Sequence, residues 1–197
     1  MPQRFDELEP LAEALAKRAA GFERPFMIAL DGRSAAGKTL LAAALAERLE
    51  AAVIEGDDFY CGGIEVRPER PAALVEACID WRQQRLVLEA LRSGQAAAWH
   101  AFDWDAFDGR LCEEQTVKAP RPIVILEGVY SARPELADLI DLAVMVRADE
   151  AVRESRLLAR EGVIGPWERQ WYAAEEYYFE FIRPLTSFDM LAIELSL

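Results

Sequence analysis

Hydrophobic positions along this chain follow two alternating patterns. Apolar residues spaced three or four positions apart predict helices over residues 5–21, 37–50, 70–94, 149–162 and 167–184. Short, nearly continuous apolar runs predict strands over residues 24–32, 51–57, 121–130, 140–148 and 188–195. Strands of this kind are typically buried on both faces. Asp80 either interrupts or N-caps the third helical stretch, and the aromatic and acidic segment 95–120 has no clean period, which indicates an irregular excursion able to include a hairpin.

Alternation of strands and helices predicts an α/β fold. Right-handed crossovers between consecutive strands give a doubly wound, mostly parallel sheet of about five strands with helices on both faces. The chain has no internal repeat, low-complexity segment or linker. We therefore expect residues 1–197 to form a single domain, with the N-terminal helix lying within residues 1–21.

Composition and charge narrow the range of partners. The 197 residues are 52% hydrophobic and 29% charged, and 22 Lys and Arg against 35 Asp and Glu give a net charge of −13. This excess disfavours nucleic acids and anionic membranes as partners. No apolar run approaches the roughly 20 residues that span a bilayer, and the N-terminus has no signal-peptide core. Three widely spaced cysteines without a CxxC pair indicate free thiols and a cytoplasmic location, and the single His100 excludes a multi-histidine metal site.

The segment GRSAAGKT, residues 32–39, matches the pattern G-x-x-x-x-G-K-[ST] in full and lies between a predicted strand and a predicted helix. Glycines at both ends let the main chain approach a phosphate chain closely, and amide N–H groups converge at the helix N-terminus. Lys38 supplies positive charge to the β- and γ-phosphates, and Thr39 offers a hydroxyl to Mg²⁺. The segment therefore predicts a nucleoside triphosphate site of the P-loop NTPase fold.

A P-loop alone does not name the reaction. The chain has no Asn-Lys-x-Asp run typical of GTPases, and its size disfavours a motor or AAA-type ATPase. Phosphoryl transfer to a small acceptor remains. Glu127, which follows four apolar residues, either holds Mg²⁺ through a water or is a solvated acid at a strand end.

Arg153, Arg156 and Arg160 recur at helical spacing and form one positive strip. The strip either covers the phosphates during transfer or forms salt bridges to nearby acids.

Several segments together resemble the uridine kinase family, which belongs to a larger group with phosphoribulokinase and bacterial pantothenate kinase. They are the P-loop region, EGDDFY (55–60), FDWD (102–105), VILEGVYSARPELADLIDLAVMV (124–146) and VRESRLLAREG (152–162). The similarity runs from about residue 26 to 194. It implies that Asp57, the first acid of the D-x-[FY]-Y run, is the base for the acceptor hydroxyl, and that Tyr60 lines the acceptor pocket, although core packing also explains Tyr60. Asp58 is then a cap or a second Mg²⁺ contact.

The acceptor loop departs from the family pattern Tyr-Asp-Phe-x-x-His-x-Arg. Phe102 replaces the Tyr, Asp103 is retained and Trp104 replaces the Phe, while Phe107 and Gly109 stand in place of the His and Arg, with Arg110 one position late. Loss of the base-reading His weakens discrimination for uridine. The tryptophans at 81, 99, 104, 167 and 171 suit either stacking on a flat ring or core packing.

The resulting expectation is an ATP- and Mg²⁺-dependent kinase that phosphorylates a hydroxyl of a small molecule, with a nucleoside as the first expectation. Within the domain, 95–120 is the acceptor-binding excursion and 153–170 the lid.

Expected site residues are Lys38, Asp57 and Arg156 for catalysis; Thr39 and Glu127 for the metal; Asp57, Tyr60, Phe102 and Asp103 for the acceptor; and Gly32, Arg33, Ser34, Ala35, Ala36, Gly37, Lys38, Thr39, Arg153 and Arg160 for the nucleotide. A kinase for a vitamin precursor or sugar, and a non-catalytic nucleotide-binding regulatory protein, are the alternatives. Preference between ATP and GTP stays open, as does whether the aromatic C-terminal helix is core or the interface of a homo-oligomer.

Overall fold

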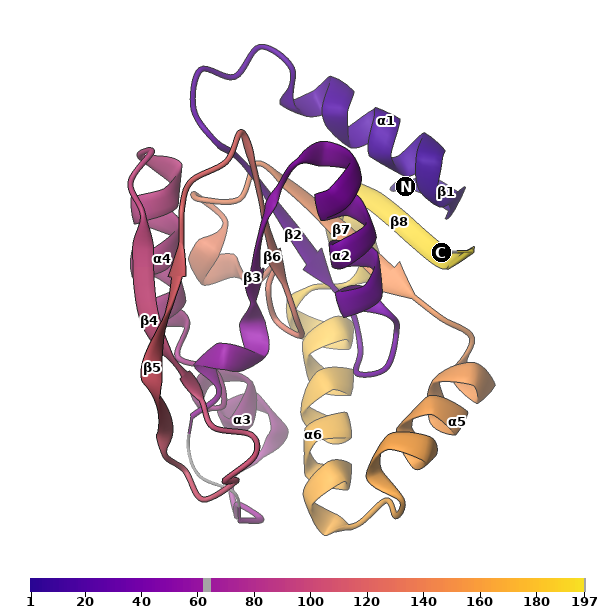
Figure 1. Ribbon diagram of the computed structural model, residues 1–197. Helices are drawn as coiled ribbons and strands as arrows, with labels where there is room; N and C mark the ends of the chain where they lie inside the picture. The colour runs from indigo at the N-terminus through magenta and orange to yellow at the C-terminus, as the bar shows by residue number, and fades with distance from the viewer. Residues whose placement is uncertain (62–64, 197) are drawn as a thin grey trace.

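A single parallel sheet organises the structure, a computed structural model that describes residues 1–61 and 65–196 (Figure 1). The strand order is β1-β8-β7-β2-β6-β3, and every neighbouring pair is parallel. The strands are β1 (Gln3–Glu7), β2 (Phe26–Asp31), β3 (Ala52–Glu55), β6 (Ile123–Glu127), β7 (Leu142–Arg147) and β8 (Met190–Ser196). The α/β class and the parallel sheet are confirmed, but the described part of the sheet has six strands rather than five.

The additional strand comes from the segment expected to be entirely helical. Residues Gln3–Glu7 pair with β8, and helix α1 begins only at Leu8 and runs to Ala19. Phe5 is buried, as are Leu8, Leu11 and Leu15, so the helical spacing of apolar residues continues through the strand. The pattern therefore could not separate the two elements, and pairing with the distant β8 decides the conformation of the first residues.

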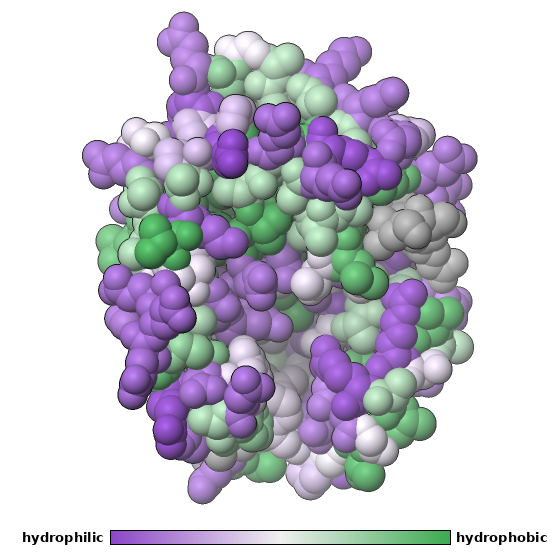
Figure 2. All heavy atoms as spheres, viewed as in Figure 1, coloured by the Kyte–Doolittle hydropathy of each residue, from purple (hydrophilic) through white to green (hydrophobic). Residues whose placement is uncertain are grey.

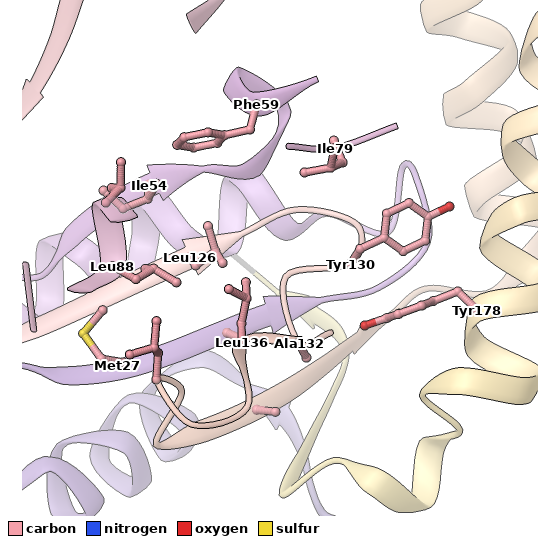
Figure 3. Close-up of a cluster of buried hydrophobic side chains, with 14 of the residues drawn as sticks. Met27, Ile54, Phe59, Ile79, Leu88, Leu126, Tyr130, Ala132, Leu136 and Tyr178 are labelled. Carbon is pink, nitrogen blue, oxygen red and sulfur yellow. The ribbon is translucent and has the colours of Figure 1, made fainter. Parts of the chain in front are cut away.

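Alternate residues of the central strand β2 face two different layers. Ile28 and Leu30 pack with α1 and with α2 (Lys38–Leu49), while Met27 and Ala29 belong to the cluster on the opposite face. Figure 3 shows Met27 and Leu126 of the sheet beside Leu88, which comes from a helix of that second layer. Because both faces are covered, β2 and β6 are apolar at every position except their last residues, Asp31 and Glu127.

The second layer contains the remaining helices and the excursion. The predicted helix over 70–94 is divided into α3 (Pro71–Ala77) and α4 (Trp81–Arg92). Asp80 N-caps α4, because its Oδ1 accepts a hydrogen bond of 3.0 Å from the Gln83 amide. In the excursion, β4 (Ala97–Phe102) and β5 (Leu111–Lys118) form an antiparallel hairpin.

Helices α5 (Glu150–Glu161) and α6 (Pro166–Tyr177) complete the fold. Figure 1 shows them as two neighbouring rods joined by a short connection, with α6 lying below the sheet's central strands. Helix α6 continues through a π-helical turn, Tyr178–Ile182. On the face in Figure 2, hydrophilic residues dominate and hydrophobic ones occur in small groups, and no described helix is long and apolar enough to cross a membrane.

Candidate functional site

The predicted phosphate-binding loop connects the end of β2 to the start of α2. Gly32 has φ +156°, and a Cβ atom added there would lie 2.3 Å from the Val146 carbonyl oxygen of β7. Gly37 is the N-cap of α2 with φ +96°, and Ala35 also has positive φ, at +62°. Only glycine tolerates the close approach at position 32, so the loop's tight path follows directly from its composition.

Lys38, the first residue of α2, is buried beneath this loop. Its Nζ donates a hydrogen bond of 3.2 Å to the Arg33 carbonyl oxygen within the loop. A buried ammonium group held by one neutral carbonyl can bind a stronger acceptor, such as a phosphate oxygen.

Thr39 and Glu127, the two expected metal residues, contact each other directly. The Thr39 hydroxyl donates to Glu127 Oε1 at 3.1 Å, which joins the start of α2 to the tip of β6. Burial raises the pKa of Glu127 to about 7, and the neighbouring Asp57 charge adds to this shift while Lys38 opposes it. A carboxylate kept from water in this way would gain from a cation beside it.

The chemistry of this pair fits Mg²⁺. No group of three or more His, Cys, Asp or Glu side chains within residues 1–61 and 65–196 is arranged as a metal site. Mg²⁺ bound with substrate phosphates usually takes only one or two protein carboxylates and keeps several waters. Thr39 and Glu127 would therefore hold the ion together with phosphate oxygens.

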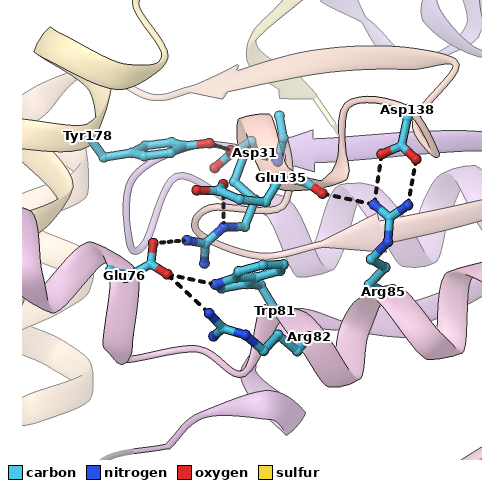
Figure 4. A network of polar contacts seen from close by, with 10 residues as sticks. Asp31, Glu76, Trp81, Arg82, Arg85, Glu135, Asp138 and Tyr178 are labelled. Atoms are coloured by element: carbon cyan, nitrogen blue, oxygen red, sulfur yellow. Dashed lines mark hydrogen bonds and ion pairs between the residues drawn. The ribbon is translucent and has the colours of Figure 1, made fainter.

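Asp31 organises the same edge of the sheet, although sequence reasoning did not single it out. It is fully buried, and it accepts hydrogen bonds from the Gly32, Tyr130 and Ala132 amides at 2.8, 3.0 and 2.9 Å and from the Tyr178 hydroxyl at 2.8 Å (Figure 4). Burial raises the pKa of Asp31, and these donated hydrogen bonds oppose the shift. The one available signal was its position at a strand end directly before Gly32.

Arg133 lies in the loop that follows β6 and is held by two acidic side chains. Its side chain is 2% exposed, with Nε donating to Glu135 at 2.9 Å and an ion pair to Glu76 of α3 at 3.4 Å. Figure 4 shows that Glu76 also accepts a hydrogen bond from the Trp81 indole and forms an ion pair with Arg82, so that α3 and α4 share the network. Tyr130 is held between the two acceptor and donor groups of this region, because its amide donates to Asp31 and its carbonyl oxygen accepts from the Arg133 amide at 3.1 Å.

The two adjacent acids that follow β3 lie in a short 3₁₀ helix, Gly56–Phe59, and have different surroundings. Asp57 is exposed and lines a cavity, whereas Asp58 accepts a hydrogen bond of 2.7 Å from the Trp99 indole of β4. Burial raises the pKa of Asp58. Asp58 therefore links the hairpin to the 3₁₀ helix that follows β3, a contact that differs from both roles considered from the sequence.

The cavity has a volume of about 670 Å³ and extends from the phosphate loop to the excursion and to α6. Its wall includes Ser34 of the loop, Asp57 and Tyr60. Phe102 lies behind this wall, with its ring 4.9 Å from that of Tyr60, and Asp103 accepts a hydrogen bond of 2.9 Å from the Ala106 amide in the hairpin loop. Of the four predicted acceptor residues, Asp57 and Tyr60 thus reach the cavity.

The three arginines of α5 have distinct partners. Arg153 is buried, donates to the Ser34 carbonyl at 2.9 Å and pairs with Glu150 at 2.7 Å. Arg156 is exposed and donates to the Ala35 carbonyl at 3.3 Å, while Arg160 lines the cavity and pairs with Glu161. Two of the arginines thus form the salt bridges to neighbouring acids that the sequence allowed, and two donate to carbonyl oxygens of the phosphate loop, while the covering of the phosphates stays a prediction.

Glu175 of α6 is a second residue that sequence reasoning missed. It is buried, and its carboxylate accepts hydrogen bonds from the Ser34 amide, at 3.1 Å, and from the Ser34 hydroxyl. No pattern distinguishes Glu175 from its neighbour Glu176 in the sequence. Only the packing of α6 reveals it.

Comparison with known proteins gives distant relatives with kinase names. No protein-family model matches the chain. A uridine kinase-like protein 3 of Arabidopsis thaliana is 28% identical over 195 residues, covering 91% of this chain and 40% of that protein, so the chain spans two fifths of this relative. A uridine kinase of Chloroflexus aggregans is 29% identical over 168 residues, covering 82% of this chain and 78% of that protein.

Solved structures show the same fold at lower identity. A possible uridine kinase of Bacillus stearothermophilus has a TM-score of 0.69 at 18% identity, covering 94% of this chain and 98% of its own. A D-glycerate 3-kinase of Cryptococcus neoformans has a TM-score of 0.67 at 15% identity, with 95% of each chain covered. The sequence relatives and the shared fold confirm the resemblance expected from the motifs: the chain is similar to uridine kinase-like P-loop kinases.

Proposed function

We propose that the chain transfers the γ-phosphoryl group of ATP to a hydroxyl of a small molecule, with a nucleoside-like acceptor. The observation that carries this proposal is the shared cavity: Ser34 of the phosphate loop and the carboxylate-bearing Asp57 line the same space. A carboxylate beyond the carboxyl end of a parallel strand lies where this class of sheet binds its ligands. The relatives named uridine kinase support the same reaction class.

In the proposed mechanism, the loop amides and Lys38 bind the phosphates, and Arg156 stabilises the charge that spreads over the transferred group. Asp57 orients the acceptor hydroxyl and takes its proton as the oxygen attacks the γ-phosphorus. The bond from phosphorus to the bridging oxygen breaks, and ADP leaves. Mg²⁺, held at Thr39 and Glu127, would neutralise charge on the β- and γ-phosphates.

Other segments have roles within this proposal. Residues 1–197 act as one kinase domain, 95–120 as the acceptor-binding excursion and 153–170 as a lid. A second cavity of about 300 Å³ lies next to the loop, lined by Arg33, Arg153 and the end of β7. We assign it to the base and ribose of the nucleotide, since residues of the phosphate loop line it and Asp57 does not.

Replacement of Asp57 by Asn tests the transfer step. The Asp57→Asn variant should bind ATP almost as the parent does and turn over about 100-fold more slowly, because the amide cannot accept the proton. Asp105→Asn, an exposed change in the hairpin loop, is the matched control. Unchanged turnover in Asp57→Asn would remove this residue from its role.

Nucleotide binding without transfer is a second candidate function. Two observations favour it: Phe107 and Gly109 replace two polar residues of the family's acceptor loop, and Glu175 occupies the Ser34 amide. Acceptor-dependent ADP release across a panel of nucleosides, sugars and vitamin precursors separates the two functions. Tight ATP binding without release for any acceptor would favour the second.

A further inference from the structure

The cavity between the phosphate loop, the excursion and α6 is strongly acidic. Six carboxylates line it within the described part of the chain: Glu55, Asp57, Asp58, Glu161, Glu168 and Glu175. The same wall contains one guanidinium, that of Arg160, and this group is already paired with Glu161 at 2.6 Å. An acceptor with its own carboxylate or phosphate would meet uncompensated negative charge here.

Aromatic rings form much of the remaining wall. Tyr60 lies at their centre, with ring centroids 5.2 Å from Trp104, 5.6 Å from Trp171 and 6.5 Å from Trp167. Phe107 packs 5.6 Å from Trp167 and closes the group on the hairpin side. Faces of such rings carry negative potential, so they attract a cation as well as stacking on a flat ligand.

Buried polar atoms without partners give an independent sign that a ligand belongs in this space. Tyr130 is 4% exposed, lines the cavity, and its hydroxyl has no hydrogen-bond partner among the described residues. Figure 3 shows this hydroxyl pointing away from the labelled apolar side chains. Trp167, Trp171 and Tyr172 line the same cavity, and the two indole N–H groups and the Tyr172 hydroxyl are buried and also lack partners in the described part of the chain. Buried donors of this kind are normally satisfied, and acceptor oxygens of a bound ligand would satisfy them.

We propose that the phosphate acceptor is a hydroxylated ligand whose planar ring carries a positive charge. The inference rests on the proposed function and names its substrate class. The rings of Trp104, Trp167 and Trp171 contact the cationic ring, and the carboxylates that line the cavity stabilise its positive charge. Oxygen atoms of the ligand accept hydrogen bonds from the buried donors that lack partners. Glu161 and Glu168 line the same cavity as Trp167 and Trp171.

Three synthetic ribosides with a six-membered aromatic ring test the assignment. N-ribosylpyridinium is cationic, C-ribosylbenzene is its neutral counterpart, and C-ribosylbenzoate carries a negative charge. Their affinities are measured by calorimetry in the presence of ADP and Mg²⁺, and turnover is measured separately as ADP release from ATP. We expect the pyridinium compound to bind about tenfold more tightly than the neutral one, and the benzoate to bind most weakly.

Glu168→Gln tests the contribution of charge. The Gln carbonyl oxygen can keep the hydrogen bond that Glu168 Oε2 accepts from the Gly165 amide, so α6 retains its cap. The preference for the cation over the neutral riboside should fall about threefold in this variant. It should persist in Glu154→Gln, an exposed change on α5 that does not line the cavity.

The affinity measurement tests the cationic acceptor, and the ADP-release measurement tests the kinase function on which that inference rests. Equal or tighter binding of the neutral riboside, or no binding of any of the three, overturns the assignment of a cationic acceptor. ADP release with neutral or anionic ribosides in that case would leave the kinase proposal standing. Preferential binding of the cation with no ADP release from any riboside would overturn its assignment as the phosphate acceptor and would favour nucleotide binding without transfer.

Discussion

Glu175 of helix α6 accepts hydrogen bonds from both the amide and the hydroxyl of Ser34 in the phosphate loop. These residues lie 141 positions apart, and the contact brings a buried carboxylate to a loop whose other features favour anions. Arg153 holds the same residue from the opposite side through the Ser34 carbonyl. The conformation of the loop thus depends on α5 and α6 as well as on its glycines.

Removal of the Glu175 charge should strengthen nucleotide binding. In Glu175→Gln the amide oxygen can still accept from Ser34, while repulsion of the phosphates is lost. We expect the Kd for ATP with Mg²⁺ to fall about threefold to tenfold, measured by calorimetry. Glu176→Gln, an exposed change on the same helix, should leave the Kd unchanged. Weaker binding in Glu175→Gln would show instead that the carboxylate is needed to order the loop.

Glu127 should make the stability of the nucleotide-free protein depend on pH. Its pKa is raised to about 7 in the fold, above the usual 4.5, mainly by burial. Between these two values the folded form keeps a proton that the unfolded chain has lost, so the free energy of unfolding falls as pH rises toward 7, by about 1.4 kcal/mol per unit. Denaturant unfolding at several pH values should show a smaller fall in Glu127→Gln than in the parent.

The matched control for that series is Glu47→Gln, an exposed change on α2. The free energy of unfolding of Glu47→Gln should depend on pH as that of the parent does. The same slope in Glu127→Gln and in the parent would mean that Glu127 is ionised in the fold throughout this range.

Lys38 should be required for both nucleotide binding and rate. Lys38→Ala removes the buried ammonium beneath the loop, and we expect at least a tenfold weaker Kd for ATP together with a loss of turnover of about 100-fold or more. Lys17→Ala, an exposed change on α1, controls for loss of a positive charge. A Lys38→Ala protein that binds ATP as tightly as the parent would contradict the assignment of the phosphate site.

Gly32 should be intolerant of any side chain. In Gly32→Ala the new methyl group would lie 2.3 Å from the Val146 carbonyl oxygen, so β2 and β7 would have to separate at their ends. Loss of stability should reach several kcal/mol, about 3 or more. Gly94→Ala shares a positive φ, +78°, but meets nothing within 4 Å, and should cost only about 1 kcal/mol. Similar melting temperatures for the two variants would refute the steric argument.

Much of the fold followed from local pattern. The runs that became β2, β3, β6, β7 and β8 were each predicted within a few residues of their observed bounds, because strands buried on both faces consist of nearly continuous apolar runs. The Asp80 cap was one of two options that the sequence allowed. β1 was missed because Phe5 continues the helical spacing of α1, and only its pairing with β8 distinguishes it.

Within the candidate site, residues adjacent in the sequence could be predicted, and residues whose partners are distant in the sequence could not. The phosphate loop was readable because its glycines, Lys38 and Thr39 are adjacent in the chain and their spacing alone dictates a tight anion-binding turn. The roles of Asp31, Asp58 and Glu175 were not, since an acid acquires a role only from the group that donates to it. Tyr178 is 147 positions from Asp31, and Trp99 is 41 from Asp58.

By itself, then, the order of residues determined the parallel α/β class, the loop and the uridine kinase-like resemblance, all of which depend on periodicity or on contiguous motifs. Packing alone decided the sixth strand, the contact between Glu175 and Ser34, and the acidic aromatic cavity between the hairpin and α6. The physical reason is that charge and hydrogen bonding act through space over a few ångströms, and the groups that meet at this sheet edge come from opposite ends of the chain.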